Sequence, residues 1–285
     1  MKQLGILGPR GTHSEEAAIY LQKFLPEKIE LVNYSEIFEV LNAVEKNEID
    51  FGFVPVENSL EGSINITLDI LARSNHLKII RELVWHVHNH LMTKPETLPQ
   101  DIKKIFSHAQ PISQCRKFLQ NNFPHAEIIN TPSTARAAEI VAESNFSEGF
   151  AAICTKRAGE LNGLKNISSE VQDNLENCTR FFEICHAEKN FDVEKIHGDK
   201  VLIICQIDGS RAGALCGVLE EFAFRGVNMT RIESRPNRTK LGEYIFFFDL
   251  ETLHDKKILN EAIEAVRQKS IWLKNLGEFP VIVAE

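Results

Sequence analysis

The sequence predicts an α/β protein made of two successive domains. Its 285 residues are enough for two domains that each bury a core of their own. Up to about residue 153, segments typical of strands alternate with segments typical of helices, which favours a parallel sheet. A mostly polar run at 187–199 comes later, and beyond it the order becomes strand, helix, strand, strand, helix, strand. We therefore expect domains at 1–186 and 200–285, joined by a linker at 187–199.

The composition is that of an ordinary globular protein, with 43% hydrophobic and 25% charged residues. The formal net charge is −8 and no block of lysine or arginine stands out, so nucleic acid and anionic membranes are not expected as partners. No apolar run is long enough for a signal peptide or a membrane span, which predicts a cytoplasmic protein. The six cysteines have no Cys-x-x-Cys spacing, so neither a disulfide nor structural zinc is expected.

The first part of the chain is expected to form an open parallel sheet with helices between its strands. Apolar runs predict strands at 4–7, 29–32 and 50–54 and helices at 15–24, 35–45 and 64–72. Thr12 and Glu15 have the spacing of a capping box, which predicts a helix N-terminus there. Free N–H groups at such an N-terminus favour an anion, and a plain strand-to-helix turn is the alternative. The turn lacks the glycine patterns of nucleotide-binding loops.

Asn58 and Ser59 follow the third predicted strand within a few residues. Ligands of open parallel sheets bind at the carboxyl ends of strands, and these two side chains can hydrogen-bond a carboxylate without adding charge. The alternative is that both are ordinary turn residues.

A long extended segment is predicted at 77–93, and it contains His86, His88 and His90. On one strand these three side chains would share a face, as metal ligands could. The only acidic residue nearby is Glu82, and no thiol lies close in the chain. We therefore expect a half-exposed strand face and no metal site.

A second series of strands and helices follows and should form a second lobe. Its strands are expected at 102–106, 127–130 and 150–153, and its helices at 110–122 and 133–143. The two lobes, joined by the segment at 77–93, would face each other across a cleft.

Ser107 and His108 come at the end of a predicted strand, and Gln114 lies near the start of the next helix. These positions are typical of active sites. A Ser-His pair suggests a hydrolase, but neighbouring strand residues point to opposite faces, and the chain has no Gly-x-Ser-x-Gly motif. His108 stays open as an acid, a ligand-binding donor or a core histidine.

Thr179 and Arg180 lie where a polar stretch leads into another predicted strand. A hydroxyl beside a guanidinium suits an anionic substrate, because threonine can donate a hydrogen bond to a departing oxygen and arginine can hold a carboxylate. A capping or turn threonine beside a surface arginine is the alternative.

The C-terminal part is expected to have strands at 201–207, 227–233, 243–250 and 272–276 and helices at 212–224 and 256–268. This order is the split βαβ, ferredoxin-like pattern. The fold alone assigns no function.

Six stretches of the chain, in order and spacing, resemble parts of a known enzyme family. The first four are similar to prephenate dehydratase: Gly8-Pro9-Arg10-Gly11-Thr12-His13-Ser14, Pro55-Val56-Glu57-Asn58-Ser59, Ser107-His108-Ala109-Gln110-Pro111 with Gln114-Cys115, and Gln172-Asp173 leading into Asn177-Cys178-Thr179-Arg180-Phe181. The last two resemble the regulatory ACT domain that follows the catalytic part in that family: Gly213-Ala214-Leu215-Cys216 and Glu233-Ser234-Arg235-Pro236.

The resemblance implies a two-lobed catalytic region like type II periplasmic binding proteins at 1–186, and an ACT domain of ferredoxin-like fold at 200–285. It implies a monofunctional lyase of L-phenylalanine biosynthesis, which converts prephenate to phenylpyruvate, water and carbon dioxide. Feedback inhibition by L-phenylalanine and a homodimer or homotetramer belong to the same expectation. No cofactor or metal is expected, because loss of the ring carboxylate makes the product aromatic without a redox step.

The resemblance also assigns roles to single residues. Thr179, Asn58, Ser107 and Gln114 match catalytic positions, with Thr179 as hydrogen-bond donor or proton relay at the departing ring hydroxyl. Thr12, Ser59, His108 and Arg180 match substrate-binding positions. Phenylalanine is expected to bind between the C-terminal domains of a dimer, at Gly213, Ala214, Leu215, Asn228, Glu233, Ser234, Arg235 and Pro236.

The chain departs from the family pattern at three positions: Ala109 where proline is usual, His13 where an aromatic residue is usual, and Cys216 where valine is usual. Two other functions stay open. An arogenate dehydratase would carry out the same elimination on the amino-acid analogue of prephenate. A non-catalytic small-molecule sensor would explain the architecture but would leave Thr179 without a role.

Overall fold

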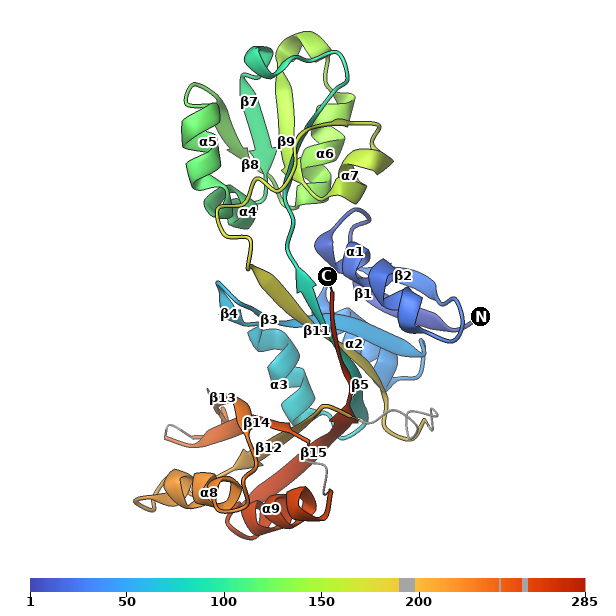
Figure 1. Cartoon of the computed structure of the whole chain (residues 1–285). Helices are drawn as coiled ribbons and strands as arrows, with labels where there is room; N and C mark the ends of the chain where they lie inside the picture. The colour runs from blue at the N-terminus through green and yellow to red at the C-terminus, as the bar shows by residue number, and fades with distance from the viewer. Residues whose placement is uncertain (190–197, 241, 253–255, 285) are drawn as a thin grey trace. The chain divides into compact units, whose positions relative to one another are not determined.

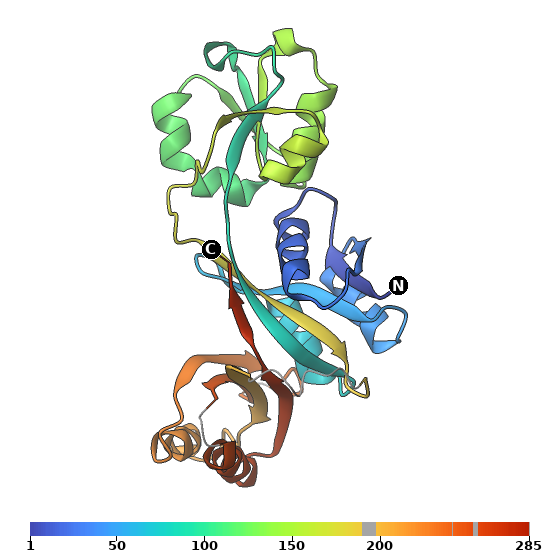
Figure 2. The same cartoon turned by 45° about the vertical axis from the view of Figure 1, so that its right-hand side comes forward.

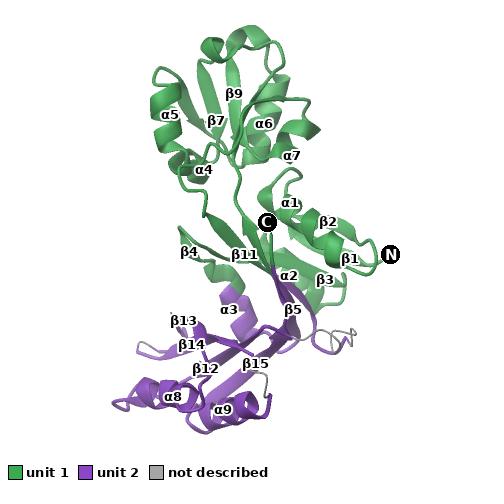
Figure 3. Cartoon of the chain, in the orientation of Figure 1, with its two compact units in different colours: residues 1–67, 83–181, 283–285 green, residues 68–82, 182–282 purple. Residues whose placement is uncertain are grey.

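The computed structural model describes residues 1–189, 198–240, 242–252 and 256–284 (Figure 1). The chain divides into two compact units (Figure 3): residues 1–67, 83–181 and 283–285 form the first, and residues 68–82 and 182–282 form the second. This division does not follow the predicted boundary at residue 186, because both long strands of the first domain have residues in each unit. Most of the predicted linker at 187–199 lies outside the described residues.

The first unit opens with the predicted series of parallel strands and helices. Its elements are β1 (Gln3–Leu7), α1 (His13–Leu21), β2 (Glu30–Tyr34), α2 (Ile37–Glu45), β3 (Phe51–Asn58), β4 (Gly62–Ser63) and the start of α3 (Asn65–Arg73). β1 pairs in parallel with both β2 and β3. The alternation predicted from the apolar runs is therefore confirmed for this lobe.

Two long strands continue this sheet. They are β5 (Leu77–His86) and β11 (Cys178–His186), and the order is β16-β5-β11-β3-β1-β2, where β16 is the short strand Val281–Val283. β11 thus lies beside β3, which brings a segment from the end of the first domain next to the Asn58 motif.

The predicted extended segment at 77–93 is two strands, not one. β5 ends at His86 and β6 (His90–Thr93) begins the sheet of the second lobe. Between them the backbone turns to other partners, because the N–H of Val87 donates to the carbonyl of Asn177 and the carbonyl of Asn89 accepts from Val171. The expectation that three histidines share one strand is therefore wrong.

The second lobe has a five-stranded sheet in the order β10-β6-β9-β7-β8. Its further strands are β7 (Lys104–Ser107), β8 (Glu127–Asn130), β9 (Phe150–Cys154) and β10 (Lys165–Ser168). β7 runs parallel to β8 and β9, whereas β6 runs antiparallel to β9. Its helices are α4 (Ala109–Gln114), α5 (Arg116–Asn122), α6 (Thr134–Glu143) and α7 (Lys156–Leu161).

The helix predicted at 110–122 is interrupted at Cys115, so α4 and α5 are separate helices. Asp173 explains the break. Its backbone N–H donates to the carbonyl of Gln114 at 2.7 Å, and its carboxylate accepts from the N–H groups of Lys117 and Phe118 at 2.9 and 3.3 Å. These bonds replace the intrahelical partners that a continuous helix would supply.

The second unit contains the predicted strand-helix-strand-strand-helix-strand series. Its elements are β12 (Lys200–Gln206), α8 (Ala214–Ala223), β13 (Met229–Pro236), β14 (Tyr244–Glu251), α9 (Lys256–Gln268) and β15 (Trp272–Phe279), and the sheet order is β13-β14-β12-β15. Alternate residues of β12, Val201, Ile203 and Cys205, share a core with Phe222 of α8 and Ile263 of α9. Both helices therefore cover one face of this sheet (Figure 2).

No helix among the described residues has the length and apolar character that crossing a membrane requires. The short strand β16 was not predicted.

Candidate active site

Asn58 at the end of β3 and Thr179 near the start of β11 form a hydrogen-bonded cluster with two neighbours. Nδ2 of Asn58 donates to Oγ1 of Thr179 at 3.0 Å and to Oδ1 of Asn177 at 3.0 Å. Oγ of Ser59 donates to the same Asn177 oxygen at 3.3 Å and accepts from the N–H of Cys178 at 3.0 Å. We call Asn58, Ser59, Asn177 and Thr179 the amide-hydroxyl cluster.

The direction of the Asn58–Thr179 hydrogen bond follows from the other end of the Asn58 amide. Oδ1 of Asn58 accepts from the backbone N–H groups of Leu60 and Glu61 at 3.0 and 3.2 Å, so the NH2 end must face Thr179. An amide nitrogen can only donate, and Oγ1 of Thr179 is therefore the acceptor. No acceptor for the Thr179 hydroxyl is found among the residues that the structure describes, so its hydrogen is available to a ligand.

Arg180 has a different partner from its neighbour Thr179. Its Nη1 lies 2.7 Å from Oε2 of Glu57, and its side chain is only 13% exposed. This guanidinium is already held by a carboxylate of the protein, so a substrate carboxylate would have to share it with Glu57. The assignment of Arg180 to substrate binding stays a prediction.

Ser107 and His108 lie where β7 leads into α4, as the sequence predicts. Ser107 is fully buried, and its hydroxyl donates to the carbonyl of Ile153 at 2.6 Å, which joins β7 to β9. Nδ1 of His108 accepts from the N–H of Gln110 at 3.5 Å, so this histidine caps the N-terminus of α4. The two residues have separate partners, and no nucleophile-base pair is formed between them.

Gln114 is hydrogen-bonded to Asn89, a fully buried residue between β5 and β6. Nδ2 of Asn89 faces Oε1 of Gln114 at 3.5 Å, Oδ1 of Asn89 lies 3.3 Å from Nε2 of His13, and the Asn89 N–H donates to Oε1 of Gln172 at 2.9 Å. Burial lowers the pKa of His13 to about 4, so this ring is neutral at neutral pH. At position 13, where the family pattern usually has an aromatic residue, this chain thus has an uncharged ring that also hydrogen-bonds.

Thr12 is the N-cap of α1, which confirms the predicted helix start. Its hydroxyl accepts from the N–H of Glu15 at 3.4 Å, and the Glu15 carboxylate accepts from the N–H of Gly11 at 2.5 Å. Arg157 of the second lobe donates to the same carboxylate at 2.9 Å. The Glu15 carboxylate thus lies at the turn before this helix, and the expected anion site and a substrate-binding role of Thr12 stay predictions.

The three histidines near the turn between β5 and β6 do not converge. Nδ1 of His88 lies 3.2 Å from Oε1 of Glu170, and the rings of His86 and His88 are 6.4 Å apart. Within the described ranges, no group of three histidine, cysteine, aspartate or glutamate side chains could hold a metal ion.

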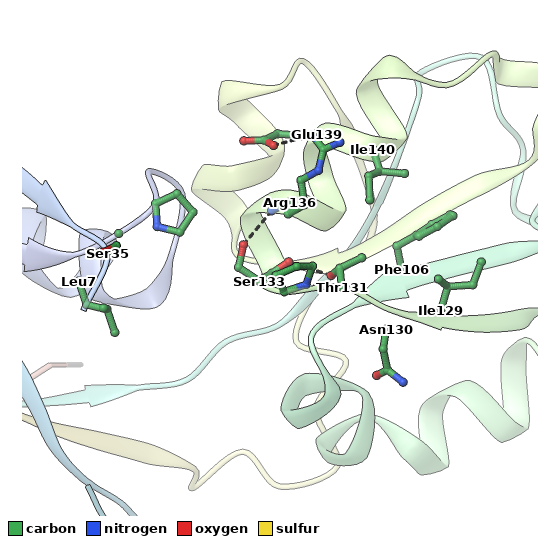
Figure 4. A pocket seen from close by; sticks show the side chains of 13 residues that line it. Leu7, Ser35, Phe106, Ile129, Asn130, Thr131, Ser133, Arg136, Glu139 and Ile140 are labelled. Carbon is green, nitrogen blue, oxygen red and sulfur yellow. Dashed lines mark hydrogen bonds and ion pairs between the residues drawn. The ribbon is translucent and has the colours of Figure 1, made fainter. Parts of the chain in front are cut away.

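A pocket of about 740 Å³ lies between the two lobes, at the ends of strands from both sheets (Figure 4). Leu7, Gly8, Pro9 and Ser35 line it from the first lobe. The second lobe contributes Phe106, Ile129, Asn130, Thr131, Pro132, Ser133, Arg136, Glu139 and Ile140. Sequence reasoning missed the residues after β8, although the polar run Asn130-Thr131-Pro132-Ser133 directly after a strand is the same signal that singled out Asn58.

In the second unit, Gly213, Ala214 and Leu215 line a pocket of about 250 Å³ together with Cys216. The other predicted effector residues lie elsewhere, on β13 or just before it. Nε of Arg235 lies 2.7 Å from Oδ1 of Asp69, and Arg238 pairs with the same carboxylate. Ser234 and Pro236 of β13 pair with Phe246 and Tyr244 of β14, which line this pocket, but neither lines it directly.

Comparison with known proteins assigns the family. The family described as "Prephenate dehydratase" matches residues 4–189. A prephenate dehydratase of Methanocaldococcus jannaschii is 34% identical over 273 residues, which cover 96% of each chain. A bifunctional chorismate mutase/prephenate dehydratase of Aquifex aeolicus is 33% identical over 278 residues, which cover 98% of this chain and 73% of the relative. The crystal structure of a prephenate dehydratase from Arthrobacter aurescens in complex with L-Phe has a TM-score of 0.86 and 30% identity, covering 98% of this chain and 90% of that chain. The chain belongs to the prephenate dehydratase family.

Proposed function

We propose that this protein converts prephenate to phenylpyruvate, water and carbon dioxide, as a carbon-oxygen lyase of L-phenylalanine biosynthesis. The observation that carries the proposal is the hydrogen bond from Asn58 to Thr179, which leaves the Thr179 hydroxyl free to donate. The amide-hydroxyl cluster lies within the segment that matches the family.

The step that most needs catalysis is the departure of the ring hydroxyl oxygen. When the ring carboxylate leaves as carbon dioxide, its bonding electrons enter the ring, and the ring hydroxyl departs with the electron pair of its own bond to carbon. Hydroxide is a poor leaving group at neutral pH, so a hydrogen-bond donor or proton donor must act on this oxygen as it departs. We assign this position to the Thr179 hydroxyl. A threonine hydroxyl is a weak acid, so it acts as a hydrogen-bond donor or as a relay for a proton that another group replaces.

The uncharged character of the amide-hydroxyl cluster fits the other half of the reaction. The departing carboxylate loses its negative charge on the way to carbon dioxide. A cation held against it would stabilise the substrate more than the transition state and would slow the reaction. Asn58 and Ser59 offer dipoles without charge, and Arg180 is held by Glu57.

We assign the remaining predicted residues to contacts with the substrate. Gln114 is oriented through Asn89, His108 has Nε2 left for a ligand, and Ser107 can only accept, because its hydrogen is bonded to Ile153. Thr12 caps α1.

Residues 200–285, most of which lie in the second unit, are proposed to be an ACT domain that binds L-phenylalanine and inhibits the enzyme. The strand order and the pocket at Gly213 support this assignment, together with the L-Phe complex of the Arthrobacter aurescens relative. We place phenylalanine in a dimer, between the Gly213 turn of one copy and the segment around Glu233 of the other. A two-lobed arrangement like type II periplasmic binding proteins and a cytoplasmic location are part of the proposal.

The test is phenylpyruvate formation by the purified, metal-stripped protein, with prephenate and arogenate assayed in parallel and with phenylalanine present or absent. We expect turnover of prephenate that phenylalanine suppresses. Turnover of arogenate alone would replace the proposal by an arogenate dehydratase. Binding of either compound without turnover would identify a small-molecule sensor and end the enzymatic assignment.

A further inference from the structure

Asn177 is the buried centre of the amide-hydroxyl cluster. It directly precedes β11 and is 0% exposed. Its Oδ1 accepts from Nδ2 of Asn58 at 3.0 Å and from Oγ of Ser59 at 3.3 Å. Its backbone carbonyl accepts from the N–H of Val87 at 2.8 Å, so the residue is anchored from a second direction.

The orientation of the Asn177 amide is determined by its donors. Because Asn58 presents its NH2 group, the Asn177 atom that faces it must be the oxygen. Nδ2 of Asn177 then points away and has no hydrogen-bond partner among the described residues. A buried donor without a partner lowers stability, so this arrangement is not explained by stability alone.

Nδ2 of Asn58 has two hydrogens and three acceptors: Oδ1 of Asn177, Oγ1 of Thr179 and the carbonyl of Cys178 at 3.1 Å. Oδ1 of Asn177 keeps the amide turned so that one hydrogen is directed to Thr179. Without that oxygen the amide can tilt toward the Cys178 carbonyl, which weakens its hydrogen bond to Oγ1 of Thr179. The Thr179 hydroxyl is then held less firmly as an acceptor, and its hydrogen is no longer directed to the departing oxygen.

We propose that Asn177 is a positioning residue, which holds Asn58 so that Thr179 accepts from Asn58 and keeps its own hydrogen for the departing oxygen of the substrate. This inference rests on the proposed elimination reaction. Asn177 touches neither the substrate nor the reacting atoms in this arrangement and acts only through Asn58 and Thr179.

The test begins with Asn177→Leu, because a leucine side chain has nearly the same shape as asparagine but no hydrogen-bond acceptor. Asn58 keeps at least the Cys178 carbonyl as an acceptor and Ser59 is exposed enough to bond water, so among the described residues no buried donor loses its last partner. The unpartnered Nδ2 also disappears. We expect a melting temperature equal to or above that of the wild type, with kcat lowered about 10- to 100-fold and KM nearly unchanged. An unchanged kcat in a folded Asn177→Leu protein would overturn the proposal.

Asn177→Asp keeps the acceptor oxygen and is the rescue variant. We expect it to retain kcat within about threefold of the wild type and to raise KM, because an added negative charge repels a dianionic substrate. Asn174→Asp is its control, since Asn174 is exposed in the same loop and its Oδ1 accepts only from the N–H of Glu176. A kcat in Asn177→Asp as low as in Asn177→Leu would contradict the role of the acceptor.

A double-mutant cycle shows whether Asn177 acts through Thr179. If it does, Asn177→Leu lowers kcat in the wild type but changes it less than about threefold in a Thr179→Val background. Equal fold-losses in both backgrounds would refute the route through Thr179. The failure of the proposed function is separate, because in that case the wild type itself does not form phenylpyruvate from prephenate.

Discussion

Thr179 is the residue on which the proposed chemistry depends, and its neighbours determine what it can do. Asn58 supplies a donor to Oγ1, and the hydroxyl hydrogen is therefore left to donate to another group. The same threonine on an isolated strand would have both its hydrogen and its lone pairs free to bond water.

Thr179→Val removes the hydroxyl but keeps the shape of the side chain, and Thr179→Ser keeps the hydroxyl. Loss of one donor to a charge that develops in the transition state lowers kcat about 10²- to 10³-fold, so we expect this loss in Thr179→Val with little change in KM. Thr179→Ser should stay within about tenfold of the wild type. Steady-state kinetics with prephenate check this. Equal activity of the valine variant and the wild type would remove Thr179 from the mechanism.

Among the elements, the α4–α5 pair shows how a distant residue shapes a local structure. Residues 110–122 have a helical pattern, yet Asp173 interrupts the helix and caps α5 from outside. The break places Gln114 at the end of a helix, next to Asn89. Without it, Gln114 would sit inside a longer helix.

Asp173→Ala removes the carboxylate that accepts from Lys117 and Phe118. Loss of a helix cap costs about 1 kcal/mol, which corresponds to a melting temperature lower by about 2–4 °C for a chain of this size. Asp173→Asn keeps one acceptor oxygen and should lose less. Thermal unfolding followed by circular dichroism measures both. A melting temperature unchanged in Asp173→Ala would show that the cap contributes nothing.

At the scale of the whole molecule, Arg235 connects the expected effector segment to a helix outside the C-terminal domain. Asp69 lies on α3, which directly follows the Asn58 motif and β4 in the chain, and both Arg235 and Arg238 pair with it inside the second unit. A ligand that competed for Arg235 would loosen this pair.

Arg235→Ala should weaken inhibition by phenylalanine while turnover without phenylalanine is retained. Loss of a hydrogen bond to a charged group costs about 1.5–3 kcal/mol, so the concentration for half-inhibition should rise about 10- to 150-fold. Arg238→Ala is the matched control, because it pairs with the same Asp69 but lies outside the expected effector motif. Inhibition curves for both variants decide the matter, and an Arg235→Ala curve identical to that of the wild type would exclude this residue from the effector site.

The sequence by itself determined the order and type of nearly all elements, because periodic apolar residues, caps and turns act over a few positions. It also pointed to Asn58, Ser107, Gln114 and Thr179 as candidate site residues, which lie at the ends of strands or helices, and to the start of α1 at Thr12.

Only the tertiary structure decided which of these residues meet. Asn58 and Thr179 are 121 positions apart, and Lys117 and Asp173 are 56 positions apart. Asn177 gave no separate signal in the sequence, since an asparagine before a strand reads as an ordinary turn residue. Hydrogen-bond partners at such separations depend on the path of the whole chain, and a local pattern of residues cannot specify that path.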